Sequence, residues 1–160
     1  PADLAAADVR DVEGIIRTIG FFHTKAANVI KCAQMVVADY GGEIPRDIDE
    51  LQKLPGVGRK SANLIRGDIF HLPAVVADTH CIRMANRIGF VTDTTDPVQV
   101  ERALVKVLPP EESNDFCHRC VMHGRVVCTA RKALCEVCCL QDVCRTGKKT
   151  IKQETLEELV

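Results

Sequence analysis

The chain has 160 residues and a net charge of −1, with 46% hydrophobic and 27% charged residues, which excludes a disordered or fibrous protein. No apolar run approaches the length of a membrane span and no basic-then-apolar leader opens the chain, while the near-neutral charge alone argues against a strongly basic nucleic-acid binder. The nine cysteines are a high and odd number, which favours a metal site in a reducing cytoplasm over a closed set of disulfides.

The first half of the chain has helical periodicity. Apolar residues spaced three and four apart predict a helix over Asn28–Tyr40, with Thr24 able to cap its start and Gly41-Gly42 ending it. Two shorter helices, Asp47–Leu54 and Arg59–Phe70, are predicted on either side of a glycine-rich turn.

Helical patterns also fill the second half. Asp78-Thr79 opens a predicted helix over His80–Ile88, and Asp96-Pro97 opens one over Val98–Leu108. A further helix over Asn114–Val127 leads into the cysteine-rich segment. Because no stretch alternates with period two for long enough to form a sheet, the sequence predicts an all-α fold.

Charge is unevenly distributed along the chain. Residues 53–66 contain four cations and no acids, and residues 117–149 contain seven cations against two acids. The near-zero total therefore hides two basic segments, although the sequence does not tell whether they share a face.

Four cysteines lie close together near the C-terminus, in the pattern C-x6-C-x2-C-x5-C: Cys128, Cys135, Cys138 and Cys144. A single C-x2-C flanked by wider loops suits the four thiolate corners of a [4Fe-4S] cluster, whereas zinc modules usually offer two separated C-x2-C pairs. Zinc remains the alternative, and Cys139 is a competing ligand. The other cysteines are interpreted as structural: Cys32, Cys81, Cys117 and Cys120.

The run Leu54-Pro55-Gly56-Val57-Gly58 between two short helices is a helix-hairpin-helix signature. Its glycines allow the turn to expose backbone N–H groups, and the start of the second helix adds partial positive charge, so together they favour a phosphate. A tight turn without a ligand is the alternative.

Lys60 and Asp78 are the candidate catalytic residues. Lys60 falls in the first turn of a predicted helix, where the helix dipole and neighbouring cations favour a neutral, nucleophilic amine for Schiff-base chemistry; a solvated surface lysine is the alternative. Asp78 could accept a proton or stabilise positive charge on a sugar ring, although a helix cap alone would account for it.

These features together resemble the endonuclease III family, bifunctional DNA glycosylase/AP lyases of the helix-hairpin-helix superfamily. The matching segments are Leu54–Asn63, Val76–His80, His123–Arg125 and the four cysteines. The resemblance implies a helical barrel followed by a [4Fe-4S] loop domain. It also implies a base-excision-repair enzyme that extrudes oxidised pyrimidines from duplex DNA.

The resemblance assigns roles to individual residues. Lys60 matches the family's nucleophile, which attacks C1′ of the sugar and forms an imine before β-elimination nicks the strand. Asp78 matches the carboxylate that assists the attack. Lys60 also favours the lyase branch over the adenine-mismatch glycosylases, which generally lack this lysine. The implied DNA-binding residues lie in the hairpin, a basic cluster loop and an apolar wedge: Gly56, Val57, Gly58, Arg59, Arg131, Lys132 and Phe21. A core position is the alternative for Phe21.

The expected parts are a barrel portion at 1–74 with the helix-hairpin-helix at about 47–70, helices that complete the barrel at 75–127, the cluster loop at 128–144 and a tail at 145–160. Relatives carry a further stretch before the position of Pro1, so the chain is expected to lack their N-terminal segment. The expected partner is double-stranded DNA with damaged pyrimidines or abasic sites, and the expected state is a cytoplasmic monomer. The alternative function is a non-catalytic DNA-binding iron–sulfur module.

Overall fold

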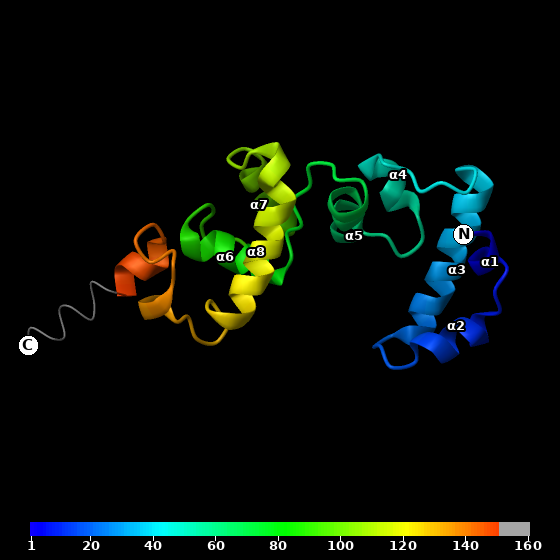
Figure 1. Cartoon of the computed structure of the whole chain (residues 1–160), viewed down its shortest axis with the longest axis horizontal. Helices are drawn as coiled ribbons and strands as arrows, with labels where there is room; N and C mark the ends of the chain where they lie inside the picture. The colour runs from blue at the N-terminus through cyan, green and yellow to red at the C-terminus, as the bar shows by residue number, and fades with distance from the viewer. Residues whose placement is uncertain (151–160) are drawn as a thin grey trace, which may run out of the picture. The chain divides into compact units, whose positions relative to one another are not determined.

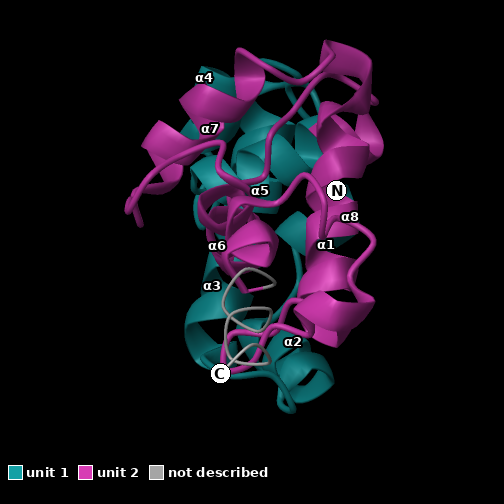
Figure 2. Cartoon of the chain, turned by 90° about the vertical axis from the view of Figure 1, so that its left-hand side faces the viewer, with its two compact units in different colours: residues 1–66 teal, residues 67–160 magenta. Residues whose placement is uncertain are grey.

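The chain folds as two compact units, Pro1–Arg66 and the part that begins at Gly67 (Figure 2). The structure is a computed structural model that describes residues 1–150. In this range the regular structure is helical, and the β pairing consists of one isolated bridge between Cys128 and Ala133 (Figure 1). The predicted all-α class is therefore confirmed.

The first unit is organised around its longest helix, α3. Helices α1 and α2 pack against α3, and α4 packs against α5. The bounds are α1 Ala2–Ala5, α2 Val9–Ile16, α3 Phe22–Asp39, α4 Ile48–Lys53 and α5 Arg59–Leu64.

Two small hydrophobic clusters hold the first unit together. Val12 of α2 is buried against Ala26 and Ile30 of α3. The second cluster joins the end of α3 to the two short helices through the buried residues Val36, Leu51, Leu54 and Ala62. The turn between α4 and α5 is thus held against a packed core.

Helix α3 begins six residues earlier than predicted, at Phe22 rather than Asn28, so Thr24 lies inside the helix and does not cap it. Phe21 precedes the helix in a left-handed conformation with φ of 58° and forms no side-chain cap. The first turn escaped prediction because most of its side chains are exposed and add nothing to the apolar stripe.

The second unit is built on contacts between α6 and the helices α7 and α8. A π-helix, η1 (Ile65–Ile69), continues α5 across the boundary between the units. The remaining bounds are α6 Thr79–Ile88, α7 Pro97–Val105, η2 Pro110–Glu112, α8 Ser113–Val126 and η3 Cys135–Val137. Helix α7 ends at Val105, three residues before the predicted Leu108, and is followed by a turn in which the Val107 N–H bonds to the Leu104 carbonyl.

Four aspartates cap helices, namely Asp8, Asp47, Asp78 and Asp96, and the caps at Asp78 and Asp96 were predicted. Asp47 accepts bonds from the Asp49 and Glu50 N–H groups, Asp96 accepts from Val98, and Asp78 caps α6. Their carboxylates satisfy N–H groups that have no partner inside the helix.

The end of the chain is described only in part. Residues 145–150 are helical, and the rest of the predicted tail, 151–160, lies outside the described residues. The domain limits expected at residues 74, 127 and 144 remain predictions. Within residues 1–150, no helix is both long and apolar enough to cross a membrane.

Candidate active site and metal centre

The turn between α4 and α5 has the geometry of a helical hairpin. The Val57 N–H donates to the Leu54 carbonyl at 3.0 Å. Gly56 has φ of 80°, and a side chain there would come within 3.0 Å of the Asn28 Cβ on α3. Both the left-handed conformation and the close approach require glycine at this position.

Lys60 and Arg59 occupy the first turn of α5, and both side chains are exposed. Gly58 precedes the helix and supplies no side-chain cap, so the first N–H groups of α5 lack a capping partner from that residue. The resulting surface combines backbone donors, the positive end of the helix dipole and two cations, as an anion site requires.

The other two cations of the first basic segment are engaged locally. Lys53 pairs with Glu50 at 2.6 Å, and Arg66 donates to the Arg46 carbonyl at 3.0 Å. The bonds from Lys53 and Tyr40 hold the pKa of Glu50 below its usual value. The positive charge nearest the turn therefore comes from Arg59 and Lys60.

Asp78 is half-buried at the start of α6 in the second unit. Its Oδ1 accepts bonds from the His80 N–H at 2.9 Å and the Cys81 N–H at 2.8 Å. Both capping bonds end on the same oxygen, so Oδ2 is available to a substrate. The capping and functional interpretations of Asp78 are thus compatible.

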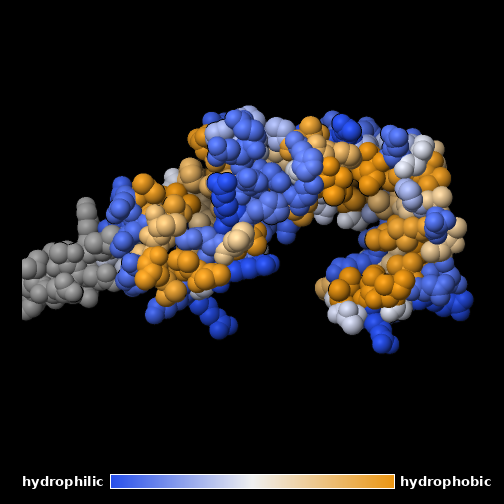
Figure 3. Space-filling view, in the orientation of Figure 1, coloured by the Kyte–Doolittle hydropathy of each residue, from blue (hydrophilic) through white to orange (hydrophobic). Residues whose placement is uncertain are grey.

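Phe21 is 87% exposed, so its alternative assignment to the core is wrong. Two further apolar residues in the same stretch of sequence, Ile15 and Ile19, are also exposed, and Figure 3 shows a hydrophobic surface where α2 runs into α3. An exposed phenylalanine on a left-handed residue is suited to inserting between bases.

The four predicted cluster cysteines line one cavity, together with Arg87 and residues of the surrounding loops. All four are free thiols. Cys139 is exposed and does not line this cavity. The cysteines that line the cavity are therefore the four predicted ligands, and Cys139 is not among them.

In the described part of the chain, no group of three or more Cys, His, Asp or Glu side chains is arranged to hold one metal ion. The four thiols that line the cavity are ligands of the kind that both a [4Fe-4S] cluster and a zinc ion take.

Two arginines of α6 that sequence reasoning missed attach this segment to the helices. Arg87 donates to the Cys128 sulfur at 3.1 Å and to the Thr129 carbonyl at 2.7 Å, and its own carbonyl accepts a bond from the Cys144 thiol at 3.2 Å. Arg83 donates to the carbonyls of Cys128 and Gly124. Their spacing of four residues places them on one face of the helix. The sequence around them, however, does not indicate which part of the chain that face contacts.

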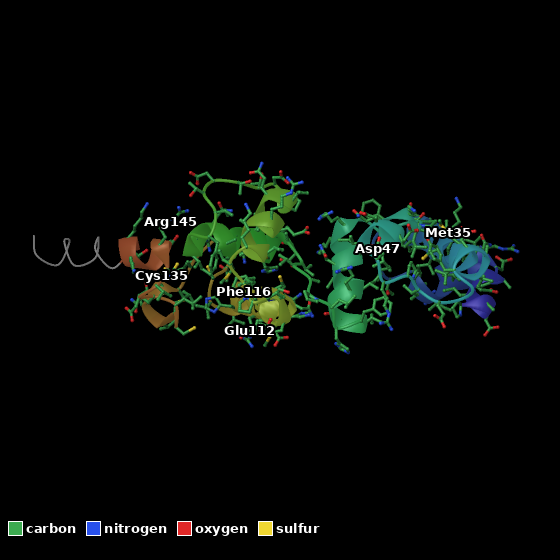
Figure 4. The ribbon with its side chains drawn as sticks, turned by 90° about the horizontal axis from the view of Figure 1, so that it is seen from above. Met35, Asp47, Glu112, Phe116, Cys135 and Arg145 are labelled. Carbon is green, nitrogen blue, oxygen red and sulfur yellow. The ribbon has the colours of Figure 1, made fainter. Side chains whose placement is uncertain are left out.

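Arg145 anchors the other end of the cluster segment. Its guanidinium donates to the Asn86 carbonyl at 2.8 Å and to the Thr92 hydroxyl at 3.0 Å. In Figure 4, Arg145 and Cys135 lie near each other at the C-terminal end of the second unit. This cation is therefore directed into the fold.

The predicted basic loop is a closed turn. Thr129 Oγ1 donates to the Lys132 carbonyl at 2.6 Å and accepts from the Lys132 N–H at 3.1 Å. The side chains of Arg131 and Lys132 are exposed on it. The basic loop is therefore a short turn, closed by hydrogen bonds, that carries two exposed cations.

The structural assignment of three other cysteines is confirmed by their burial: Cys81, Cys117 and Cys120. Hydrogen bonds join the thiol of Cys81 to the other two. The bond with Cys117 lowers the pKa of Cys81, but the bond with Cys120 and burial outweigh it and raise that pKa to about 12. The Cys81 thiol therefore stays protonated at neutral pH and is inert as a nucleophile.

A family model decides the relationship of the chain. Residues 1–110 match the model of the HhH-GPD superfamily of base excision DNA repair proteins. The chain belongs to this superfamily. It is 39% identical to endonuclease III of Bacillus subtilis, over 96% of this chain and 70% of that protein. It is also 39% identical to endonuclease III of Escherichia coli K12, over 93% of this chain and 70% of that protein.

Solved structures of HhH-GPD relatives agree. A trapped covalent endonuclease III–DNA intermediate matches with a TM-score of 0.85 and 42% identity, covering 94% of this chain and 71% of that one. A thermostable thymine-DNA glycosylase matches with a TM-score of 0.81 and 26% identity, covering 92% of this chain and 70% of that one. This HhH-GPD protein is thus a base-excision-repair enzyme of the DNA glycosylase/AP lyase class.

Proposed function

We propose that the chain removes oxidised pyrimidines from duplex DNA and then nicks the strand, with Lys60 as the nucleophile. The neutral amine of Lys60 attacks C1′ of an extruded nucleotide, the bond from C1′ to the base breaks, and the base leaves with a proton. The sugar ring opens to give an imine on Nζ. Loss of a C2′ proton then breaks the C3′–O bond on the 3′ side, and water hydrolyses the imine to free the lysine.

Asp78 assists the first step in this proposal. Its Oδ1 is committed to capping α6, which fixes the carboxylate, while Oδ2 accepts the proton of the attacking amine or stabilises positive charge on the sugar. The hairpin residues Gly56–Arg59 and the loop cations Arg131 and Lys132 bind backbone phosphates, and Phe21 fills the duplex beside the extruded nucleotide.

One observation carries the proposal: Lys60 is an exposed lysine in the first turn of the helix that follows the hairpin. A reactive amine there lies next to the surface suited to a phosphate. The related endonuclease III that was trapped as a covalent DNA intermediate supports the same chemistry for this chain.

Borohydride trapping tests this proposal. The intact protein should form a covalent adduct with duplex DNA containing thymine glycol or an abasic site, because borohydride reduces the imine. Lys60→Ala should form none. Lys53→Ala is the matched control, since Lys53 lies before the hairpin and pairs with Glu50, and it should trap like the wild type. Undiminished trapping by Lys60→Ala would refute the proposal.

We also propose that Cys128, Cys135, Cys138 and Cys144 hold a [4Fe-4S] cluster. When bound, the cluster supplies a rigid cross-link that organises the basic loop, since base removal and β-elimination need no electron transfer. Iron and sulfide analysis with a visible spectrum should give about four of each per chain. Stoichiometric zinc without sulfide would contradict the assignment.

The proposed substrate is double-stranded DNA carrying damaged pyrimidines or abasic sites, bound by a monomer in the cytoplasm.

A further inference from the structure

The segment Ala74–Ala77, which has no regular secondary structure, leads directly into Asp78. It pairs with no strand in the described part of the chain, yet Ala74, Val75 and Val76 are buried. A buried N–H group without an acceptor is costly. The position of Asp78 therefore depends on what this segment bonds to.

Helix α8 supplies two acceptors to the segment. Ser113 Oγ accepts from the Ala74 N–H at 3.1 Å, and Cys117 Sγ accepts from the Val76 N–H at 3.2 Å. Ser113 and Cys117 lie four residues apart on α8, so their side chains lie on one face of the helix. Side chains of α8 therefore satisfy two buried N–H groups of this segment.

Cys117 is also connected to the other side of Asp78. Its thiol is hydrogen-bonded to the thiol of Cys81, and the Cys81 N–H donates to Asp78 Oδ1 at 2.8 Å. On the near side, the Asp78 N–H donates to the Val76 carbonyl at 2.8 Å. Val76 and Cys81 both bond to Asp78, one from each side along the chain, and both also bond to the Cys117 sulfur.

The environment of Cys117 argues against a reactive role for it. The bond with Cys81 and burial raise its pKa far above the ordinary thiol value, so the side chain stays neutral. A neutral buried thiol is a poor nucleophile but a stable hydrogen-bonding group.

We propose that Ser113 and Cys117 are positioning residues that fix the carboxylate of Asp78 for base excision. This proposal rests on the proposed function, because it has a catalytic consequence only where Asp78 assists the attack by Lys60. Neither residue touches the substrate. Ser113 acts through the Ala74 backbone, and Cys117 acts through the Val76 backbone and the Cys81 thiol.

Single-turnover excision of thymine glycol from duplex DNA measures the consequence. Cys117→Ala should lower the rate by about tenfold or more, because small displacements of a catalytic group cost that much, while DNA affinity stays unchanged. Cys117→Ser keeps an acceptor and should restore most of the rate. Cys120→Ala is the matched control. It removes an equally buried thiol of the same helix that also bonds to Cys81, but the Ala74 and Val76 N–H groups bond to Ser113 and Cys117 instead, so this variant should keep the wild-type rate.

Amide hydrogen exchange provides a readout that does not need activity. Exchange at Val76 should be about tenfold faster in Cys117→Ala than in Cys120→Ala, as expected for one lost buried bond. Exchange at Ala74 should respond in the same way to Ser113→Ala.

The two proposals fail in different ways. If the wild-type protein neither excised the base nor formed the trapped adduct, the proposed function would be refuted. Hydrogen exchange at Val76 would still test the bond from the Val76 N–H to the Cys117 sulfur. Equal rates in Cys117→Ala and Cys120→Ala, no rescue by Cys117→Ser, or unchanged Val76 exchange would each overturn the positioning role.

Discussion

Asp78 shows how one carboxylate can have both a structural and a chemical role. Asparagine caps helices about as well as aspartate, so Asp78→Asn should keep the bonds to His80 and Cys81 and change the free energy of unfolding by no more than about 1 kcal/mol. It removes the charge and the proton acceptor, so excision should fall by about 100-fold or more. Thermal unfolding and single-turnover kinetics measure the two effects separately.

Asp96→Asn is the matched control for that prediction. Asp96 caps α7 through the Val98 N–H and has no proposed role in the reaction, so its variant should keep full excision. If Asp78→Asn also kept full excision, Asp78 would be a cap and nothing more.

At the level of residues, local signals identified Lys60 and Asp78, because a helix start is visible in the sequence itself. Ser113 and Arg87 were missed for a physical reason. Each acts on backbone about 40 positions away, at Ala74 and at Cys128 respectively, and no local pattern encodes such a partner. The sequence therefore showed the candidate catalytic groups but not the distant residues that bond to the surrounding backbone.

At the level of elements, the helix starts capped by Asp47, Asp78 and Asp96 were predicted, whereas α2, which Asp8 caps, was not. The start of α3 was not, since Phe21 ends the preceding turn through its backbone conformation. The end of α7 was also missed, because apolar residues continue past Val105 after the helix has ended.

The packing of α6 against α8 depends on Gly124. A side chain there would come within 2.7 Å of His80 Nδ1 and of the Arg83 guanidinium, and Arg83 also bonds to the Gly124 carbonyl. Gly124→Ala should therefore lower the free energy of unfolding by about 1–3 kcal/mol, as overpacking does. Chemical denaturation measures the change.

Gly14→Ala on α2 is the opposite case. Gly14 is helical and has nothing within 4 Å of an added Cβ, so alanine should stabilise the protein by about 0.5–1 kcal/mol. Equal effects of the two substitutions would show that helix propensity, not the contact with His80 and Arg83, determines the outcome at Gly124.

At the level of the whole molecule, net charge was a poor guide to DNA binding. The total of −1 conceals the two basic segments, and the structure shows that their cations differ in role. Arg66 and Arg145 bond to backbone carbonyls, whereas Arg131 and Lys132 are exposed on a closed turn. Counting charges could not separate these groups, because the distinction depends on tertiary contacts.

The cluster segment illustrates the same limit. The spacing of its four cysteines pointed to a polynuclear centre, and the structure places all four around one cavity. The attachment of this segment to α6 through Arg87 and Arg145 was not visible in the sequence. Hydrogen bonds to a ligand sulfur orient the ligand as well as stabilise the fold.

The central claim is that Lys60 forms the covalent bond to DNA. Its most direct test is mass spectrometry of the borohydride-trapped adduct after proteolysis. We predict that the deoxyribose remnant is attached to the peptide that contains Lys60. Attachment to another amine, such as the N-terminus or a lysine outside α5, would contradict the account.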